Sequence, residues 1–486
     1  MKKYIFYTAL IGLYLYIPCF ISNISLKHFF EIFGATFILI AASLFSKYLF
    51  AIISLFSLII STILIHLTIH LGNAKDFDER IEIALMSPQN EKREYLKHFI
   101  TISDITEIIY LIIGIGLIFW FLKTQKIQIN KKIRYTALFA FIIGAIIGKN
   151  GITPYVDIRY IIKAKEKIKN LKKRAIFLKK HFKYINFTPE YNKVVLIMGE
   201  SKNKHFMNVY DYKIQDTPFL SSLKNLYIFN AFSPANLTKL SVPIDLSYIT
   251  NTHFKDFYHT KSIVTTFNEL NYTTYFISNQ LDDENNISLT SSIANEAKIK
   301  YFPKHTTYDS VLVKYLYSIP HNNKKEFYLF HLIGSHFVYD LRYPKNKALF
   351  KNPKNIQQKY VNTIYYTDSI LKQIFNYFKN DKVLIIYLSD HGETIRNDGK
   401  PGHGMTPSYK DAYEIPFIIF SSINNPKLKE LKKMNFKKFN AQNLPYMIEY
   451  LIGMTNEANI SYSDTILITS PKRKSTYSSR KFYKGD

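Results

Sequence analysis

The sequence predicts a chain of two parts: a transmembrane domain of five helices, then an α/β domain whose mostly parallel sheet carries helices on both faces. Two observations predict this fold class. Five apolar segments precede residue 150, and most of them approach the length at which a helix crosses a hydrocarbon core of about 30 Å. From about residue 190, apolar runs of strand length alternate with helical stretches, which favours a parallel sheet with helical crossovers.

The composition allows more than one domain and limits the partners. The chain has 486 residues, and its 64 Lys and Arg against 37 Asp and Glu give a net charge of +27. Much of this excess reflects a general bias toward Lys, Ile, Asn, Tyr and Phe, and the rest borders apolar segments, so we expect no nucleic-acid partner. Because the chain has a single cysteine, Cys19, an intramolecular disulfide is excluded.

The five apolar segments are expected to span the membrane as helices. The first is too long for a cleaved signal peptide and lacks a small-residue cleavage site. The alternative is the buried helical core of a soluble protein, which five such segments in succession disfavour. The segments cover residues 4–22, 28–46, 48–71, 106–122 and 134–149.

Basic residues beside these segments predict the topology, because cytoplasmic flanks carry an excess of Lys and Arg. Lys2 and Lys3 place the N-terminus inside, and the basic loop 123–134 is expected in the cytoplasm. The loop 72–105 and the chain after about residue 150 then lie outside. We therefore expect a multi-pass protein of the bacterial inner membrane whose second domain lies in the periplasm.

A bridging helix is predicted between the two domains. In residues 155–185, Ile and Leu recur at nearly helical spacing with nine Lys and Arg between them. This pattern is typical of a basic amphipathic helix on an anionic lipid surface, and a helix packed on the second domain is the alternative. The expected domains are a transmembrane domain 1–150, a bridging helix and linker 151–190, a periplasmic domain 191–470 and a basic surface tail 471–486.

The predicted strands end in residues that bind metals. Glu200, His336, Asp390 and His391 each follow an apolar run, and ligands of parallel sheets bind outside the carboxyl ends of the strands. Carboxylate and imidazole are zinc ligands, whereas an isolated Asp-His pair more often caps a segment and fills a turn. The strands are expected at 193–198, 273–278, 327–333, 383–388 and 415–419, with a helix at 356–378.

A candidate nucleophile lies in a hydroxyl-rich turn, residues 234–243, that leads into a probable helix. Thr238 and Ser241 are the hydroxyls, and one near a helix N-terminus is well placed to meet phosphate. A metal ion lowers the pKa of such a hydroxyl. The alternative is that either residue only caps the helix.

Taken together, these residues resemble the membrane-bound phosphoethanolamine transferases of the alkaline phosphatase superfamily, which modify lipid A or the lipopolysaccharide core and have a sulfatase-like periplasmic domain. The likeness covers the whole chain. Six motifs occur in the family's order: Gly199-Glu200-Ser201, Thr238-Lys239-Leu240-Ser241-Val242-Pro243, Gly334-Ser335-His336, Tyr366-Thr367-Asp368, Ser389-Asp390-His391-Gly392-Glu393 and Gly402-His403-Gly404.

The resemblance implies a zinc enzyme. Glu200, Asp390, His391 and Thr238 are implied as ligands of one firmly held Zn²⁺, with Thr238 also the nucleophile. It attacks the phosphorus of phosphatidylethanolamine, diacylglycerol leaves, and the phosphoethanolamine-threonine intermediate passes its group to lipid A or a core sugar. Because phosphoethanolamine adds a positive amine, resistance to cationic peptides such as polymyxin is an expected consequence.

Other motif residues receive secondary roles. His336 and His403 are implied to bind the phosphoryl group, assist the leaving group or hold a second zinc. Asn279 and Gln280 are candidates for contact with the donor head group, with a plain turn as the alternative, and Lys239 either adds charge near the phosphate or points to solvent. Five further residues are expected to serve the fold, and the chain is expected to be a monomer: His205, Ser241 as a helix cap, Asp309, Thr367 and Asp368.

The sequence departs from well-known lipid A-modifying members, which carry periplasmic disulfides around the nucleophile motif. Here Ile244 follows Ser-Val-Pro and no such cysteine exists, so lipid A and core heptose both stay open as acceptors. One alternative function is a phosphoglycerol transferase of the same superfamily, which as a class lacks the Thr-x-x-Ser-Val-Pro arrangement. Another is a catalytically inactive, lipid-binding regulator of envelope synthesis, which the intact set of site residues disfavours.

Overall fold

The computed structural model describes residues 2–15, 26–71, 102–124, 129–147, 158–280, 288–303, 308–395, 402–403, 409–433 and 439–454. These residues form two compact units that divide between Lys167 and Ile168. Cys19, the predicted loop around 72–100, Gly404 and the predicted tail 471–486 lie outside the described residues.

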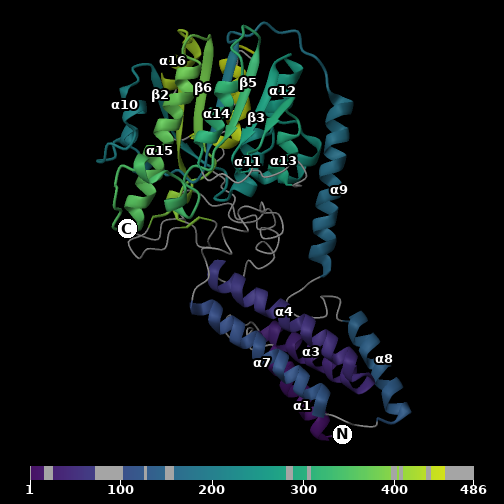
Figure 1. Ribbon diagram of the computed structural model, residues 1–486. Helices are drawn as coiled ribbons and strands as arrows, with labels where there is room; N and C mark the ends of the chain where they lie inside the picture. The colour runs from purple at the N-terminus through teal and green to yellow at the C-terminus, as the bar shows by residue number, and fades with distance from the viewer. Residues whose placement is uncertain are drawn as a thin grey trace. The chain divides into compact units, whose positions relative to one another are not determined.

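Helices account for the smaller unit at the places where the apolar segments predict them (Figure 1). Each begins and ends within a few residues of a predicted segment wherever that segment is described. Their bounds are α1 Lys2–Leu15, α3 Leu26–Phe45, α4 Lys47–Leu71, α7 Ile102–Thr124 and α8 Lys131–Ile147.

The smaller unit has its own core and an apolar exterior. Tyr14 donates from its hydroxyl to the carbonyl oxygen of Tyr110 at 2.6 Å, and the two rings are stacked. Among the described residues, one helix, Thr106–Thr124, is long and apolar enough to cross a membrane, so the predicted count of five spans stays a prediction. Large apolar side chains are more than half exposed on each of the five helices, including Phe6, Phe37, Ile52, Phe119 and Phe139.

An eight-stranded sheet forms the centre of the larger unit, with the order β4-β3-β5-β1-β6-β7-β2-β8. All five predicted strands are present, and they differ from the predicted bounds by at most two residues. Three further strands, β2, β4 and β8, were not predicted. The bounds are β1 Lys193–Gly199, β2 Leu226–Phe232, β3 Thr273–Ser278, β4 Ile299–Tyr301, β5 Glu326–His331, β6 Val383–Ser389, β7 Glu414–Ser421 and β8 Phe439–Asn440.

The sheet is mixed, although most of its pairs are parallel. β1 pairs in parallel with β5 and with β6, and β5 continues in parallel to β3 and β4. The predicted strand at 415–419 is β7, which runs antiparallel to both of its neighbours, β6 and β2. The carboxyl ends of β1, β3, β5 and β6 therefore meet at one edge of the sheet.

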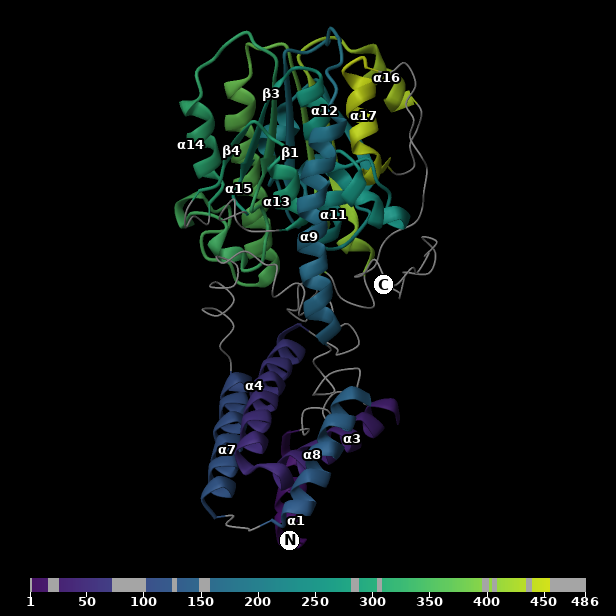
Figure 2. The same ribbon diagram turned by 90° about the vertical axis from the view of Figure 1, so that its right-hand side faces the viewer.

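Helices cover both faces of this sheet, as predicted (Figures 1 and 2). Val194, Leu196 and Met198 of β1 enter one hydrophobic cluster, and Val195 and Ile197 enter a second on the opposite face. The first cluster contains residues of α11 Thr238–Leu246, α12 Ile263–Glu269, α13 Leu289–Ala294, α16 Pro426–Lys433 and α17 Leu444–Leu451. The second contains residues of α10 Pro218–Ser222, α14 Ser310–Ser318 and α15 Ile356–Tyr377.

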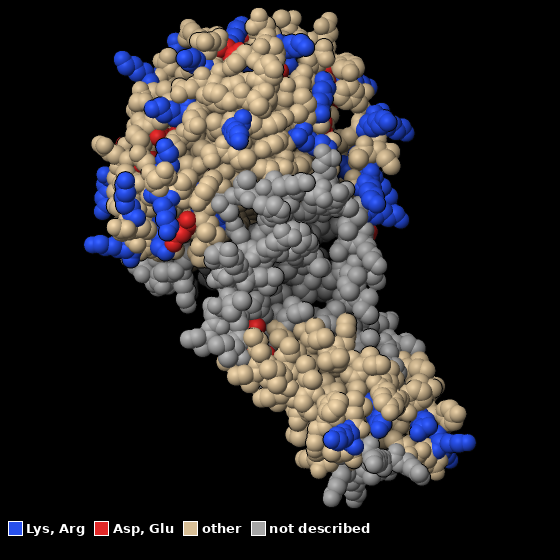
Figure 3. All heavy atoms as spheres, in the orientation of Figure 1, with Lys and Arg blue, Asp and Glu red and all other residues tan. Residues whose placement is uncertain are grey.

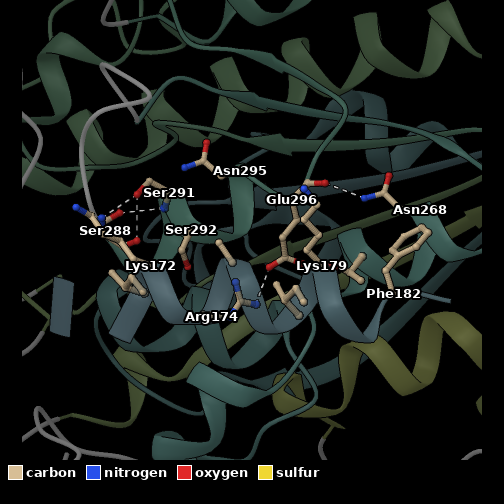
Figure 4. A pocket seen from close by; sticks show the side chains of 14 residues that line it. Lys172, Arg174, Lys179, Phe182, Asn268, Ser288, Ser291, Ser292, Asn295 and Glu296 are labelled. Atoms are coloured by element: carbon tan, nitrogen blue, oxygen red, sulfur yellow. Dashed lines mark hydrogen bonds and ion pairs between the residues drawn. The ribbon is translucent and has the colours of Figure 1, made fainter. Parts of the chain in front are cut away.

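The bridging helix, α9 Ile158–His181, packs against the larger unit with its C-terminal half. Leu171 and Arg174 are buried there. Arg174 donates to the carbonyl oxygens of Phe257 (2.9 Å) and Thr260 (3.2 Å) and pairs with Glu296 at 2.6 Å, as Figure 4 shows. A groove of about 440 Å³ lies beside this contact, between α9 and α12–α13. For this half of α9 the alternative prediction, packing on the domain, is the one observed.

Candidate active site

Two adjacent strands place three of the predicted metal ligands. Gly199 at the end of β1 pairs with Ser389 at the end of β6, and the Asp390 amide donates to the Gly199 carbonyl oxygen at 3.1 Å. Glu200, Asp390 and His391 are therefore the first residues beyond two neighbouring strands. Because each strand is fully buried, these side chains start from a rigid edge.

Thr238 reaches this edge from the first position of α11. The N-cap residue is Leu237, which offers no side-chain cap, so the idea that Thr238 itself caps the helix is wrong. Ser241, expected to cap the helix, instead donates from Oγ to the carbonyl oxygen of Leu237 at 3.0 Å. The Thr238 hydroxyl is thus left for the site, and Lys239 follows it as the second residue of the helix.

The four predicted ligands form a compact set. Thr238 Oγ1 lies 3.0 Å from Glu200 Oε2 and 3.2 Å from His391 Nε2. His391 Nε2 lies 3.3 Å from Glu200 Oε1 and 3.4 Å from Asp390 Oδ2. Tetrahedral zinc with bonds of about 2.0–2.2 Å would separate neighbouring ligand atoms by about 3.3–3.6 Å. These atoms thus have nearly the spacing of the corners of a zinc tetrahedron.

The Asp390 carboxylate gives a second test of the fit. Its Oδ1 accepts the amides of Ser201 (3.2 Å) and His391 (2.7 Å). Its Oδ2 is buried and has no hydrogen-bond partner among the described residues. A buried carboxylate oxygen without a donor is costly unless a cation meets it. The donor set of two carboxylates, one imidazole and one hydroxyl therefore fits a zinc ion.

Hydrogen bonds from neighbouring loops fix the ligands. Ser201 donates from Oγ to Glu200 Oε1 at 2.5 Å, and Gln280 donates from Nε2 to Glu200 Oε2 at 3.0 Å. His391 Nδ1 lies 2.8 Å from the carbonyl oxygen of Gly392, which as acceptor requires the proton on Nδ1 and leaves Nε2 free to bind a metal. Gln280, predicted as a head-group contact, therefore lies in the site but holds a ligand.

The pKa shifts describe a site with uncompensated negative charge. Burial alone raises the pKa of Glu200, but His391, His336 and His403 outweigh it and hold that pKa well below its usual range. Burial, and then the neighbouring Glu200 carboxylate, raise the pKa of Asp390 well above its usual range. Burial lowers the pKa of His391 to about 4. A neutral imidazole between two carboxyl groups is suited to a cation.

His403 lies beside the four-atom set. Its ring centroid is 4.2 Å from that of His391, and its potential ligand atom lies within 4.8 Å of those of Glu200 and His391. Its Nδ1 lies 3.2 Å from Glu393 Oε2. Burial lowers the pKa of His403, but Glu393 reverses the effect, so the net pKa is raised.

His336 is held farther out, on the loop after β5. Its Nδ1 lies 2.7 Å from the carbonyl oxygen of Phe337. The loop approaches Glu200 through Gly334, which has a φ of +47°, and a Cβ there would lie 2.9 Å from Glu200 backbone atoms. Asp309 accepts the amides of Ile333 (2.8 Å) and Gly334 (3.0 Å), which fixes this approach.

Some predicted residues serve the fold instead. Asn279, predicted as a head-group contact, donates to Asp309 at 3.1 Å. His205 pairs with Glu414 at 2.5 Å, away from the ligand set. Asp368 accepts the amides of Phe219 and Leu220 at the start of α10.

Sequence reasoning gave no role to Ser201 or Glu393, although both lie inside quoted motifs. Ser201 follows a predicted ligand directly, and that adjacency was the available signal. Glu393 gave no signal of its own, since its partner His403 is ten residues away along an irregular segment.

Comparison with known proteins identifies relatives of this fold and site. The family described as Sulfatase matches residues 192–448. The Phosphoethanolamine transferase EptA of Helicobacter pylori is 33% identical over 268 residues, which cover 49% of each chain. The chain thus spans about half the length of the first curated relatives it matches.

Two solved structures share the fold. The integral membrane protein lipooligosaccharide phosphoethanolamine transferase A (EptA) from Neisseria meningitidis has a TM-score of 0.61 and 16% identity, covering 92% of this chain and 95% of its own. The C-terminal periplasmic domain of EptC from Escherichia coli, in complex with Zn, has a TM-score of 0.54 and 20% identity, covering 60% of this chain and 95% of its own.

Proposed function

The chain belongs to the sulfatase family, and from that membership and its site we propose that it transfers phosphoethanolamine from phosphatidylethanolamine to lipid A or a lipopolysaccharide core sugar. The observation that carries the proposal is the Thr238 hydroxyl, held at 3.0–3.2 Å from Glu200 and His391 beside an unpartnered Asp390 oxygen. A threonine has no structural need for these partners at a sheet edge. It has a clear use for them as a nucleophile.

Zinc is the cofactor that we propose. Glu200, Asp390, His391 and Thr238 would hold it, and His336 and His403 would face the phosphoryl group. When bound, a zinc ion lowers the pKa of a coordinated hydroxyl and stabilises negative charge on phosphoryl oxygens. The EptC domain that shares this fold is described as a complex with Zn, which supports the choice of metal.

The protein's own residues account for the remaining chemistry. Thr238 Oγ1 forms the new bond to phosphorus, and its proton leaves toward Glu200 Oε2, the nearest acceptor at 3.0 Å. The bond from phosphorus to the diacylglycerol oxygen breaks, and His403 supplies that oxygen with a proton, because its raised pKa favours the protonated form. In the second half, the acceptor oxygen attacks the phosphoethanolamine-threonine and Thr238 is regenerated.

A membrane location is part of the proposal, because the donor and the acceptor are lipids. The exposed apolar side chains on all five helices of the smaller unit are typical of a lipid-facing surface. The relative from Neisseria meningitidis is described as an integral membrane protein. We infer five spans, a periplasmic catalytic domain from about 191 and a monomeric enzyme.

Nucleic acid is not a proposed partner despite the net charge of +27. In the view of Figure 3, Lys and Arg side chains are scattered over the larger unit and do not gather into one stripe. A nucleic-acid site needs such a basic patch.

Mass spectrometry of lipid A and core oligosaccharide, from cells with and without this protein, tests the function. We expect a gain of phosphoethanolamine on one of the two in the presence of the protein. A gain of glycerol phosphate on a glycan would support the phosphoglycerol transferase instead. No gain on any envelope component, with zinc-loaded protein present, would favour the inactive regulator.

A further inference from the structure

His403 is the one histidine of the site, among the described residues, whose Nδ1 meets a carboxylate. Nδ1 of His391 meets the carbonyl oxygen of Gly392, and Nδ1 of His336 meets that of Phe337. Nδ1 of His403 lies 3.2 Å from Glu393 Oε2. A carboxylate is a stronger acceptor than a carbonyl oxygen and fixes both the tautomer and the ring orientation.

Glu393 is itself held rigidly. Its side chain is 1% exposed. The Tyr339 hydroxyl donates to Oε2 at 3.0 Å, and the Thr394 amide donates to Oε1 at 3.0 Å. Asn203 also donates to the main-chain oxygen of Glu393 at 3.0 Å. The carboxylate is therefore fixed from the loops after β1, β5 and β6 before it meets His403.

The backbone brings His403 to this carboxylate. Thr394 and Gly402 form an isolated antiparallel bridge, with amide-to-carbonyl distances of 3.3 and 3.0 Å. The bridge returns the chain to the position next to Glu393, and His403 follows directly. The His403 ring is then bounded by Glu393 at Nδ1 and by the His391 ring, at 4.2 Å between centroids.

We propose that Glu393 is a positioning residue for His403: it holds the Nδ1 proton and so presents Nε2 to the leaving oxygen of the donor lipid. This inference rests on the proposed phosphoethanolamine transfer and names the residue on which proton delivery in its first half depends. As the bond between phosphorus and the diacylglycerol oxygen breaks, the electron pair stays on that oxygen. The proton on His403 Nε2 moves to it, and Glu393 keeps the proton on Nδ1 in place.

The chemistry of the leaving group provides the test. Diacylglycerol leaves as a strongly basic alkoxide and needs a proton, whereas p-nitrophenolate leaves without one. With the full-length, zinc-loaded protein, we compare phosphatidylethanolamine and p-nitrophenyl phosphoethanolamine as donors. For Glu393→Gln we expect kcat to fall by about 10- to 100-fold with the lipid donor, with little change in KM, and much less with the aryl donor.

Two control variants separate positioning from general damage. Glu414→Gln removes the carboxylate of another Glu–His pair, with His205, away from the ligand set, and is expected to leave the ratio of the two donors unchanged. Glu393→Asp keeps a carboxylate and is expected to recover part of the lipid-donor rate. If Glu393→Gln slows both donors equally, or if its zinc content falls in parallel with its rate, the positioning role is wrong.

A measurement without turnover separates this inference from the proposed function. In protein labelled with ¹⁵N-histidine, the His403 ring resonances report which nitrogen carries the proton. We expect a protonated Nδ1 in the wild type and a changed pattern in Glu393→Gln, with His391 unchanged. An unchanged His403 pattern overturns the inference even if transfer occurs. A wild type that uses neither donor overturns the proposed function, and the proton-delivery role of Glu393 with it.

Discussion

His391 and His403 lie with their ring centroids 4.2 Å apart, yet their surroundings drive their pKa values in opposite directions. Burial lowers the pKa of His391 to about 4, and the neighbouring His403 lowers it further. Burial acts on His403 in the same direction, but the Glu393 carboxylate outweighs it and the net pKa is raised. Paired groups separated in this way divide the work of a site, one as a neutral ligand and the other as a proton donor.

Substitution of the nucleophile is expected to abolish transfer without unfolding the protein. Thr238→Ala should lower transfer by about 10³-fold or more, because no neighbouring hydroxyl replaces Oγ1. Thr238→Ser should keep part of the activity. Intact-mass analysis should detect a phosphoethanolamine adduct in the wild type and none in Thr238→Ala. Full lipid modification by Thr238→Ala would show that another residue attacks.

Loss of the unpartnered carboxylate is expected to empty the metal site. Asp390→Asn should weaken zinc binding by at least about 10- to 100-fold, since Oδ2 is a proposed ligand. Elemental analysis of the purified full chain measures the zinc content. Asp245→Asn changes a buried carboxyl group outside the ligand set and should leave the zinc content at the wild-type value. Equal zinc in Asp390→Asn would remove Asp390 from the site.

Asp245 is expected to destabilise the fold at neutral pH. Its side chain is fully buried, and neither carboxylate oxygen has a hydrogen-bond partner among the described residues. Burial raises its pKa well above the usual range, so the folded state keeps a proton that the unfolded state loses. The associated stability is complete below the unfolded-state pKa of about 3.9 and is lost as pH rises from there toward the folded-state pKa, by about 1.4 kcal/mol per pH unit.

Asp245→Asn should therefore raise the thermal midpoint at pH 7–8 and change it little near pH 4. Thermal unfolding of the full chain in detergent across this pH range is the measurement. An equal effect of the substitution at both pH values would contradict the assignment.

Glycine is expected to be required at position 334. In Gly334→Ala the φ of +47° costs about 1–2 kcal/mol for a residue with a Cβ, and the new atom would lie 2.9 Å from Glu200 N and O. Because both atoms belong to the backbone of a proposed ligand, we expect a lower thermal midpoint together with weaker zinc binding. Gly116→Ala, where a Cβ meets nothing within 4 Å, is the matched control and should change neither quantity.

The buried anchor of α9 is expected to contribute substantially to stability. Arg174→Met leaves the Glu296 carboxylate buried with only the hydroxyl and amide donors of Ser262 and Thr265. Removing one partner of a buried ion pair costs about 3–5 kcal/mol. The double variant Arg174→Met, Glu296→Gln should recover part of this loss in thermal unfolding. A double variant less stable than Arg174→Met would show that the uncompensated charge is not the cause.

The strands that could be predicted are those buried on both faces. β1 and β6 are seven-residue strands without an exposed residue, and a continuous apolar run marks such strands in sequence. β2 alternates exposed and buried residues around Asn230, β4 has three residues and β8 has two, so no run marks them. The antiparallel direction of β7 depends on which strands it pairs with, and a local pattern does not carry that information.

The site shows the same limit. Glu200, Asp390 and His391 follow predicted strands directly, so their meeting at one edge follows from the parallel pairing of β1 and β6. The contact of Gln280 with Glu200 depends on how the loop after β3 bends back, and that of Glu393 with His403 on the bridge between Thr394 and Gly402. Such contacts arise from tertiary folding and leave no periodic pattern.

The pairing of β1 with β6 also sets when this site exists. The Ser201 amide and the Asp390 carboxylate that it contacts are 189 residues apart in sequence, and the strands that carry them are neighbours. During synthesis and export, Glu200 and Thr238 emerge long before Asp390 and His391. Until β6 is inserted beside β1, the chain offers a threonine and one carboxylate, and no four-ligand centre. Metal loading is therefore a late event of maturation, which follows translocation of nearly the whole catalytic domain.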